Sequence, residues 1–144
     1  MSVRFQVTFD AADPEGLAAF WETALGYERQ DPPEGYATWE EWAAGVGIPK
    51  ERWNDFAARV DPDGVRPRLF FQRVPEPKTV KNRVHLDVNV SGDRSVPRAE
   101  RRRQVDAEVE RLVRAGAKRL KVNEEQDEYW VVMQDPEGNE FCLQ

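Results

Sequence analysis

The fold is decided by the stretch VRFQVTFD, residues 3–10, in which apolar and polar residues alternate. A period of two predicts a half-buried strand, with one face packed on a core and the other left polar. The stretch VHLDVNV, residues 84–90, has the same period. The polar faces of the two predicted strands carry Gln6, Thr8 and Asp10 in the first, and His85, Asp87 and Asn89 in the second.

A helix and further strands follow each of these two segments. Asp13 can cap the first helix, Pro14 suits its first position, and Gly26 ends it. The apolar stripe of the second helix comprises Val105, Val109, Leu112 and Val113, and we expect that helix to stop at Gly116. Each half then closes with a hairpin, around DPDG at 61–64 and DPEG at 135–138. The chain is therefore expected to repeat one strand, helix and strands unit.

The repeat divides the chain into module 1, about residues 1–77, and module 2, about residues 78–144, within one domain. Only module 1 has a long insert, about residues 35–59, with a capping-box pattern from Thr38 to Glu41. A second short helix is expected from Pro49, with Trp53, Phe56 and Ala57 facing inward. We expect the tryptophans Trp39, Trp42 and Trp53 to bury the insert against the domain or a second subunit; a lid over a cleft is the alternative.

Charge and composition exclude several classes of partner. The chain has 144 residues and a formal net charge of −6, so its field repels nucleic-acid backbones and anionic lipid. The basic stretch from Arg98 to Arg103 is interleaved with acids and suits a solvated helix face. No apolar run is long enough to span a membrane. One cysteine, Cys142, allows no intrachain disulfide, and the start at Met1 has no signal-peptide pattern, so we expect a cytoplasmic protein.

The polar faces of the leading strands predict a binding site. If the apolar faces pack under helices, the polar groups must point to the opposite side, where the last strand adds Glu140 and Cys142. A concave surface with a few polar groups among apolar neighbours is the default ligand site. His85, the only histidine, is either a satisfied structural side chain or the functional residue.

The sequence resembles a known family. The motifs are QVTF (6–9) with the helix through Phe20-Trp21 to Leu25-Gly26, then RVHLDV (83–88) and DPEGNEFCL (135–143). Together they are similar to the glyoxalase, bleomycin resistance protein and extradiol dioxygenase group, the vicinal oxygen chelate superfamily, in its glyoxalase-like branch. The resemblance implies an α+β fold of two βαβββ modules with curved mixed sheets enclosing a cleft, in a homodimer or a domain-duplicated equivalent.

The resemblance also implies where a metal would bind. Enzymes of the group hold a divalent ion with residues of the first and last strands of each module, typically two His and two Glu. Here the first-strand positions hold Gln6 and His85. The last-strand position of module 2 holds Cys142, and that of module 1 falls on Phe70 or Gln72. No cofactor is therefore expected; if a divalent metal is present, the candidate ligands are Gln6, Gln72, His85 and Glu140.

Three functions remain open at this point. The first is binding or sequestration of a small, aromatic or cationic molecule in the cleft; the contacts would come from Gln6, Thr8, Asp10, Gln72, His85, Asp87 and Cys142. The second is a metal-dependent lyase, isomerase or dioxygenase reaction, with His85 and Glu140 as the catalytic candidates. The third is a structural or protein-interaction role.

Overall fold

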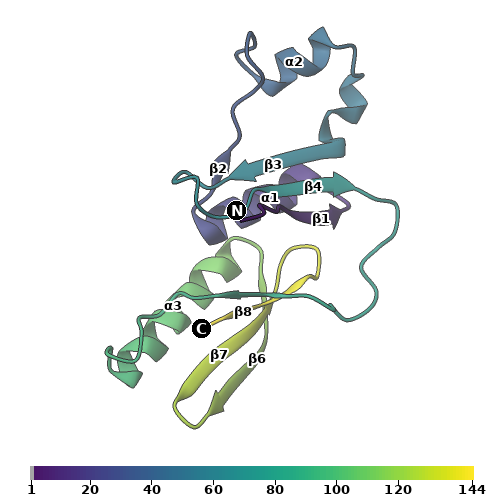
Figure 1. The fold of residues 1–144 in the computed structure, drawn as a ribbon. Coiled ribbons are helices and arrows are strands. Elements are labelled where there is room, and N and C mark those ends of the chain that lie inside the picture. Colours follow the sequence, from purple (N-terminus) through teal and green to yellow (C-terminus); the bar gives the residue numbers. More distant parts are fainter. Residues whose placement is uncertain (1) are drawn as a thin grey trace. The chain divides into compact units, whose positions relative to one another are not determined.

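Two four-stranded sheets, each with one long helix, make up this computed structural model, which describes residues 2–144 (Figure 1). The chain divides after Pro77 into an N-terminal unit and a C-terminal unit. The N-terminal unit contains β1 (Val7–Ala11), α1 (Pro14–Leu25), β2 (Glu28–Arg29), α2 (Trp39–Gly45), the 3₁₀ segment η1 (Lys50–Asp55), β3 (Phe56–Val60) and β4 (Leu69–Arg73). The C-terminal unit contains β5 (Leu86–Val88), α3 (Arg98–Arg114), β6 (Lys118–Glu125), β7 (Glu128–Gln134) and β8 (Glu140–Leu143).

The two sheets have the same topology. Their strand orders are β1-β4-β3-β2 and β5-β8-β7-β6, and in each the first and last strands pair in parallel while the other pairs are antiparallel. Each unit is thus one βαβββ module, and the predicted α+β fold with an internal repeat is confirmed.

The helix caps predicted from the sequence are present in the structure. The Asp13 side chain accepts from the Gly16 amide at 3.1 Å, and Gly26 ends α1 in a left-handed conformation with φ of 66°. Thr38 caps α2 through the Glu41 amide at 3.0 Å. In return the Glu41 carboxylate accepts from the amide of Ala37, one residue before the cap. The basic stretch lies in α3, where Arg98 and Arg102 both pair with Glu124.

Each helix covers one face of its own sheet. Leu17 and Trp21 of α1 pack with Leu69 and Phe71, all nearly inaccessible, and Phe9 stacks on Phe71 at 5.1 Å. In the C-terminal unit the buried set comprises Val105, Val109, Leu112, Val131, Met133, Phe141 and Leu143. Two aspartates in the hairpin turns are also buried, and each accepts backbone amides: Asp61 from Val65 and Arg66, Asp135 from Glu137 and Asn139.

Several apolar residues that the alternation placed in the core are exposed. β1 begins only at Val7, and Phe5 is 70% exposed because its partner strand β4 starts at Leu69. Val3 and Val84 likewise precede the strands and are exposed. The expected inward position of Phe56 is also wrong. It is followed by the buried Ala57, and consecutive strand residues face opposite sides.

The stripe of α3 is narrower than predicted, because Val113 is exposed at its margin. No helix in residues 2–144 combines the length and the apolar character needed to cross a bilayer.

The units differ most at the outer edge of the third strand. In the C-terminal unit β6 pairs with β7 over its whole length, from Lys118 to Glu125. In the N-terminal unit β2 pairs only with Arg59 and Val60, so residues 56–58 of β3 have a neighbour on the β4 side alone. The insert with α2 and η1 arches over this edge of β3 (Figure 1).

Candidate functional site

The open face of the N-terminal sheet, opposite α1, gathers the side chains predicted from the first strand. Asp10 lies across from Gln72, whose Nε2 donates to Asp10 Oδ1 at 2.8 Å, and Thr8 lies across from Phe70. Gln6 Nε2 donates to Thr8 Oγ1 at 3.3 Å. Gln6, Thr8, Asp10 and Gln72 therefore share one face, although hydrogen bonds to one another already engage much of their polar capacity.

Arg68, one residue before β4, extends this face. Its Nε donates to Gln30 Oε1 at 2.6 Å and its Nη1 to Gln6 Oε1 at 3.0 Å. The guanidinium also lies over the ring of Phe70, 5.2 Å from its centroid. Burial lowers the pKa of Arg68. Within residues 2–144, the side-chain acceptors of this half-buried cation are the neutral amide oxygens of Gln30 and Gln6.

The insert encloses a cavity of about 490 Å³ at this edge of the sheet. The apolar lining comes from Trp39, Trp42, Ala43, Ile48 and Trp53 of the insert and from Phe56, Ala57, Ala58 and Phe70 of the strands. Trp39 meets Trp42 edge to face at 5.5 Å, and Phe56 stacks on Phe70 at 5.7 Å. A cavity of this size with five aromatic side chains in its lining suits a small organic molecule.

Two of the three insert tryptophans that line this cavity donate their indole N–H to backbone carbonyls. Trp39 Nε1 donates to the carbonyl of Gln30 at 2.6 Å, and Trp53 Nε1 donates to that of Ile48 at 2.9 Å. The rings of Trp39 and Trp53 are therefore held by hydrogen bonds to the main chain and can offer apolar surface to a ligand. The tryptophans of the insert are half-buried, and the exposed part of their surface lines the cavity.

The open face of the C-terminal sheet carries the second set of predicted residues. His85 Nε2 lies 3.2 Å from Asp87 Oδ1, and both side chains are half exposed. Asp87 lies across from Cys142, which is buried. Burial, and then the charge of Asp87, raise the pKa of the Cys142 thiol. Glu140, two residues before Cys142 in β8, forms an ion pair with Lys81.

The register assigns the first module's counterpart of Cys142. Cys142 lies across from Asp87 and Phe70 lies across from Thr8, and these pairs occupy equivalent positions in the two sheets. Phe70, rather than Gln72, is therefore the matching last-strand residue, and its ring offers no ligand atom.

The residues present do not fit the metal set of two His and two Glu that the resemblance implies. Gln6 already accepts a hydrogen bond from Arg68, and a guanidinium at that point repels a divalent cation. Phe70 cannot ligate, and Cys142 stands where the set would have a glutamate. A three-donor group does occur in the C-terminal unit, where ligand atoms of His85, Asp87 and Cys142 lie within 4.8 Å of one another.

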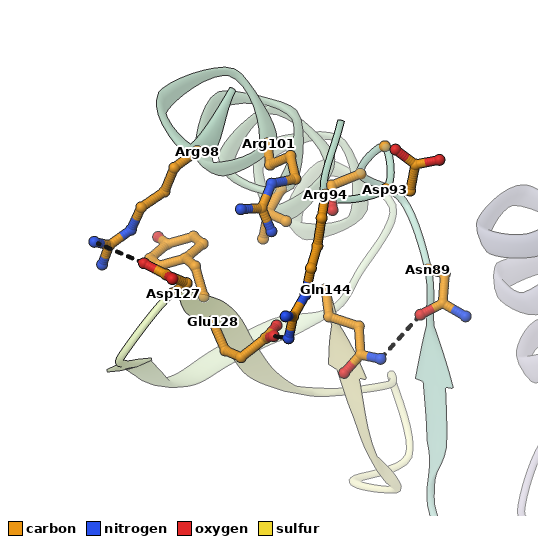
Figure 2. A pocket seen from close by; sticks show the side chains of 12 residues that line it. Asn89, Asp93, Arg94, Arg98, Arg101, Asp127, Glu128 and Gln144 are labelled. Atoms are coloured by element: carbon orange, nitrogen blue, oxygen red, sulfur yellow. Dashed lines mark hydrogen bonds and ion pairs between the residues drawn. The ribbon is translucent and has the colours of Figure 1, made fainter. Parts of the chain in front are cut away.

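A second, more polar hollow of about 350 Å³ lies between the start of α3 and the β6–β7 turn (Figure 2). Its charges are largely neutralised within the protein: Arg94 pairs with Glu128 at 2.8 Å, and Arg98 lies 3.9 Å from Asp127. Gln144 Nε2 donates to Asn89 Oδ1 at 2.9 Å on its other side. Arg101, which also lines the hollow, donates from Nε to the carbonyl of Val96 at 3.1 Å.

Sequence reasoning did not identify Arg68 as a site residue. A usable signal was present, because Arg68, Phe70 and Gln72 alternate with Leu69 and Phe71 and so share the face of Gln6 and Thr8. The contact of Arg68 with Gln30, and its place in the cavity lining beside the insert, could not be predicted because these residues are distant from Arg68 along the chain.

Solved structures share this fold at low sequence identity. A glyoxalase/bleomycin resistance protein/dioxygenase family enzyme from Burkholderia phytofirmans is 18% identical, with a TM-score of 0.61 over 96% of this chain and 94% of that one. A mutant fosfomycin resistance protein, FosX, from Listeria monocytogenes, complexed with Mn(II) and a dihydroxypropylphosphonic acid, is 12% identical. Its TM-score is 0.63 over 100% of this chain and 90% of that one.

The fold also matches a bleomycin-binding protein from Streptomyces verticillus complexed with copper(II)-bleomycin. It is 18% identical, with a TM-score of 0.53 over 100% of this chain and 96% of that one. The comparison with curated proteins found no match. A family model described as a glyoxalase-like domain matches residues 6–144, nearly the whole chain. Together with the paired βαβββ modules, this match shows that the chain belongs to the glyoxalase-like domain family, within the vicinal oxygen chelate superfamily.

Proposed function

We propose that this protein binds a small organic molecule in the cavity between its tryptophan-rich insert and the β3–β4 edge of the N-terminal sheet. The observation that carries the proposal is the cavity of about 490 Å³, whose walls include Trp39, Trp53, Phe56 and Phe70. Its volume is within the range typical of small-molecule sites. Covering the exposed aromatic rings with a ligand removes apolar surface from water, which favours binding. Gln6 reaches the same site through Arg68.

A thermal-shift screen of metabolites and antibiotics tests the proposal. A ligand at about a hundredfold its dissociation constant adds roughly 2.7 kcal/mol of stability, which raises the melting temperature of a chain this size by about 10 °C. We expect the shift to be lost in Phe70→Ala and strongly reduced in Trp53→Leu. His85→Ala, on the other sheet, is the matched control. A hit that loses its effect in His85→Ala and keeps it in both cavity variants would place the ligand elsewhere.

A second candidate function is acid–base catalysis by His85. The contact with Asp87 favours it, because a carboxylate on one ring nitrogen orients the imidazole and leaves the other nitrogen for a substrate. If this function is correct, a substrate found by turnover screening is converted by wild-type protein and by the control Val113→Ala, an exposed change on α3. Turnover is then lost in His85→Gln and reduced in Asp87→Asn. Equal turnover in all four proteins excludes His85 as the base.

We also propose a homodimer located in the cytoplasm. Exposed apolar side chains at Val3, Phe5 and Val84 favour a partner surface, and the single cysteine suits a reducing compartment. Light scattering coupled to size exclusion should give twice the chain mass of 16.6 kDa. A monomer at micromolar concentration contradicts the dimer.

A further inference from the structure

The arginines that line the cavity differ in whether they form an ion pair with a carboxylate. Three of its four arginines have a carboxylate partner: Arg29 with Glu40 at 3.2 Å, Arg52 with Asp55 at 3.0 Å, and Arg59 with Glu15 at 2.6 Å. For Arg68, residues 2–144 supply no carboxylate partner, only the amide oxygens of Gln30 and Gln6.

This arrangement leaves one of the cavity's arginines without a carboxylate to neutralise its charge. It also leaves donor capacity, because Nη2 of Arg68 has no acceptor in the described part of the chain. A guanidinium presents its N–H groups as a planar fork that matches carboxylate and phosphate oxygens. Because Arg68 is half-buried, its attraction for an anion is screened less than that of a fully exposed side chain.

The position of Arg68 is fixed before any ligand arrives. Two hydrogen bonds to glutamine oxygens and the ring of Phe70 hold the guanidinium at the cavity wall, so little side-chain entropy remains to be lost on binding. The same Phe70 ring stacks on Phe56 and continues into the aromatic lining. One cavity therefore joins an apolar aromatic wall to a fixed cation.

We infer that the ligand is an organic anion: an aromatic or similarly flat apolar body against the tryptophan and phenylalanine rings, with a carboxylate or related acidic group on Arg68. The inference rests on the proposed binding function and narrows its ligand class. It also departs from the cationic ligand that the aromatic composition alone allowed, because Arg68 repels a cation placed on Phe70.

Three probes with one aromatic body test the charge preference: 2-naphthoate, 2-naphthamide and 2-naphthylmethylammonium. Each is titrated into the protein while tryptophan fluorescence is recorded, since three of the five tryptophans line the cavity. We expect naphthoate to bind about tenfold more tightly than naphthamide, and the ammonium probe to bind most weakly. The preference for naphthoate should shrink as salt is added.

Two substitutions assign the preference to one residue. Arg68→Gln should bring naphthoate to within about twofold of naphthamide while leaving naphthamide binding unchanged, and Arg68→Lys should keep part of the preference. Arg52→Gln is the matched control, because it removes a paired positive charge from the same cavity and should leave the preference intact. Circular dichroism and melting curves establish that each variant folds.

The outcomes separate the two proposals. If all three probes bind alike, or the ammonium probe binds most tightly, the cavity binds small molecules and the anionic class is wrong. If naphthoate keeps its preference in Arg68→Gln, the assignment to Arg68 is wrong. If no probe changes the fluorescence or the melting temperature, the proposed cavity fails, and the inference about its ligand fails with it.

Discussion

Arg59 donates from Nη2 to Glu15 Oε1 at 2.6 Å and so ties β3 to the first turn of α1. The arginine is 3% exposed, and its Nε also donates to Glu22 on the next turns of the helix. Both carboxylates remain nearly half exposed to water. The interaction is therefore asymmetric. Without the carboxylates the buried guanidinium would have neither water nor a counter-charge, whereas without Arg59 both carboxylates would still be hydrated.

That asymmetry predicts an order of stabilities. Arg59→Met should lower the free energy of unfolding by about 1–3 kcal/mol, because the freed carboxylates can hydrate. The double variant Glu15→Ala/Glu22→Ala should cost more, about 3–5 kcal/mol, since it leaves a buried guanidinium without compensation. Urea unfolding of the three proteins measures both differences. The reverse order contradicts this interpretation.

Acid should weaken the first hairpin through Asp61. The hydrogen bond from the Arg66 side chain, followed by those from backbone amides, holds the pKa of this carboxyl well below its ordinary value. A carboxyl with a depressed folded pKa stabilises the protein above its unfolded pKa of about 4, and that stability is lost progressively as the pH falls below it. Between pH 6 and pH 3, wild-type protein should therefore lose more stability than Asp61→Asn. Parallel losses in the two proteins would exclude Asp61 as the source.

The phenol of Tyr129 should ionise at a higher pH than an ordinary tyrosine. Burial, and then its hydrogen bond to Asp106, raise its pKa to about 12. An ultraviolet absorbance titration should show one of the three tyrosines ionising near that value, and Asp106→Asn should lower it. The raised pKa adds stability that is complete below pH of about 10 and is lost as the pH rises towards 12. Tyr129→Phe should remove the late titration step while keeping the ring beneath Arg102.

Metal content is the fourth test. Protein purified without added metal should carry well under one equivalent of any transition metal, because Arg68 opposes a cation at Gln6 and Phe70 supplies no ligand. Elemental analysis measures this, with His85→Ala as the comparison. A stoichiometric metal that is lost in His85→Ala would instead favour the enzymatic function on the C-terminal sheet.

The sequence predicted local structure well, because helix caps and strand alternation depend on residues that are close together in the chain. Asp13, Pro14 and Gly26 set the ends of α1, and the alternation around Leu86 put His85 and Asp87 on one face. It could not predict the cavity, because Arg68 meets Gln30 and Gln6 only after β4 pairs in parallel with β1. Alternation also overestimated burial at Phe5 and Val84, since a periodic pattern does not show where the neighbouring strand begins.

The short β2 leaves residues 56–58 of β3 as an unpaired strand edge, next to the largely exposed Phe56. An apolar edge with free N–H and C=O groups can pair with the edge of another molecule and start aggregation. In the C-terminal unit, the full-length β6 occupies the equivalent edge of β7. The insert beside β3 therefore also protects against misassembly: its helical turns offer no strand for a sheet to extend onto. A chain shortened to remove residues 35–50 would lose that protection, and with it Trp39 and Trp42 of the cavity lining.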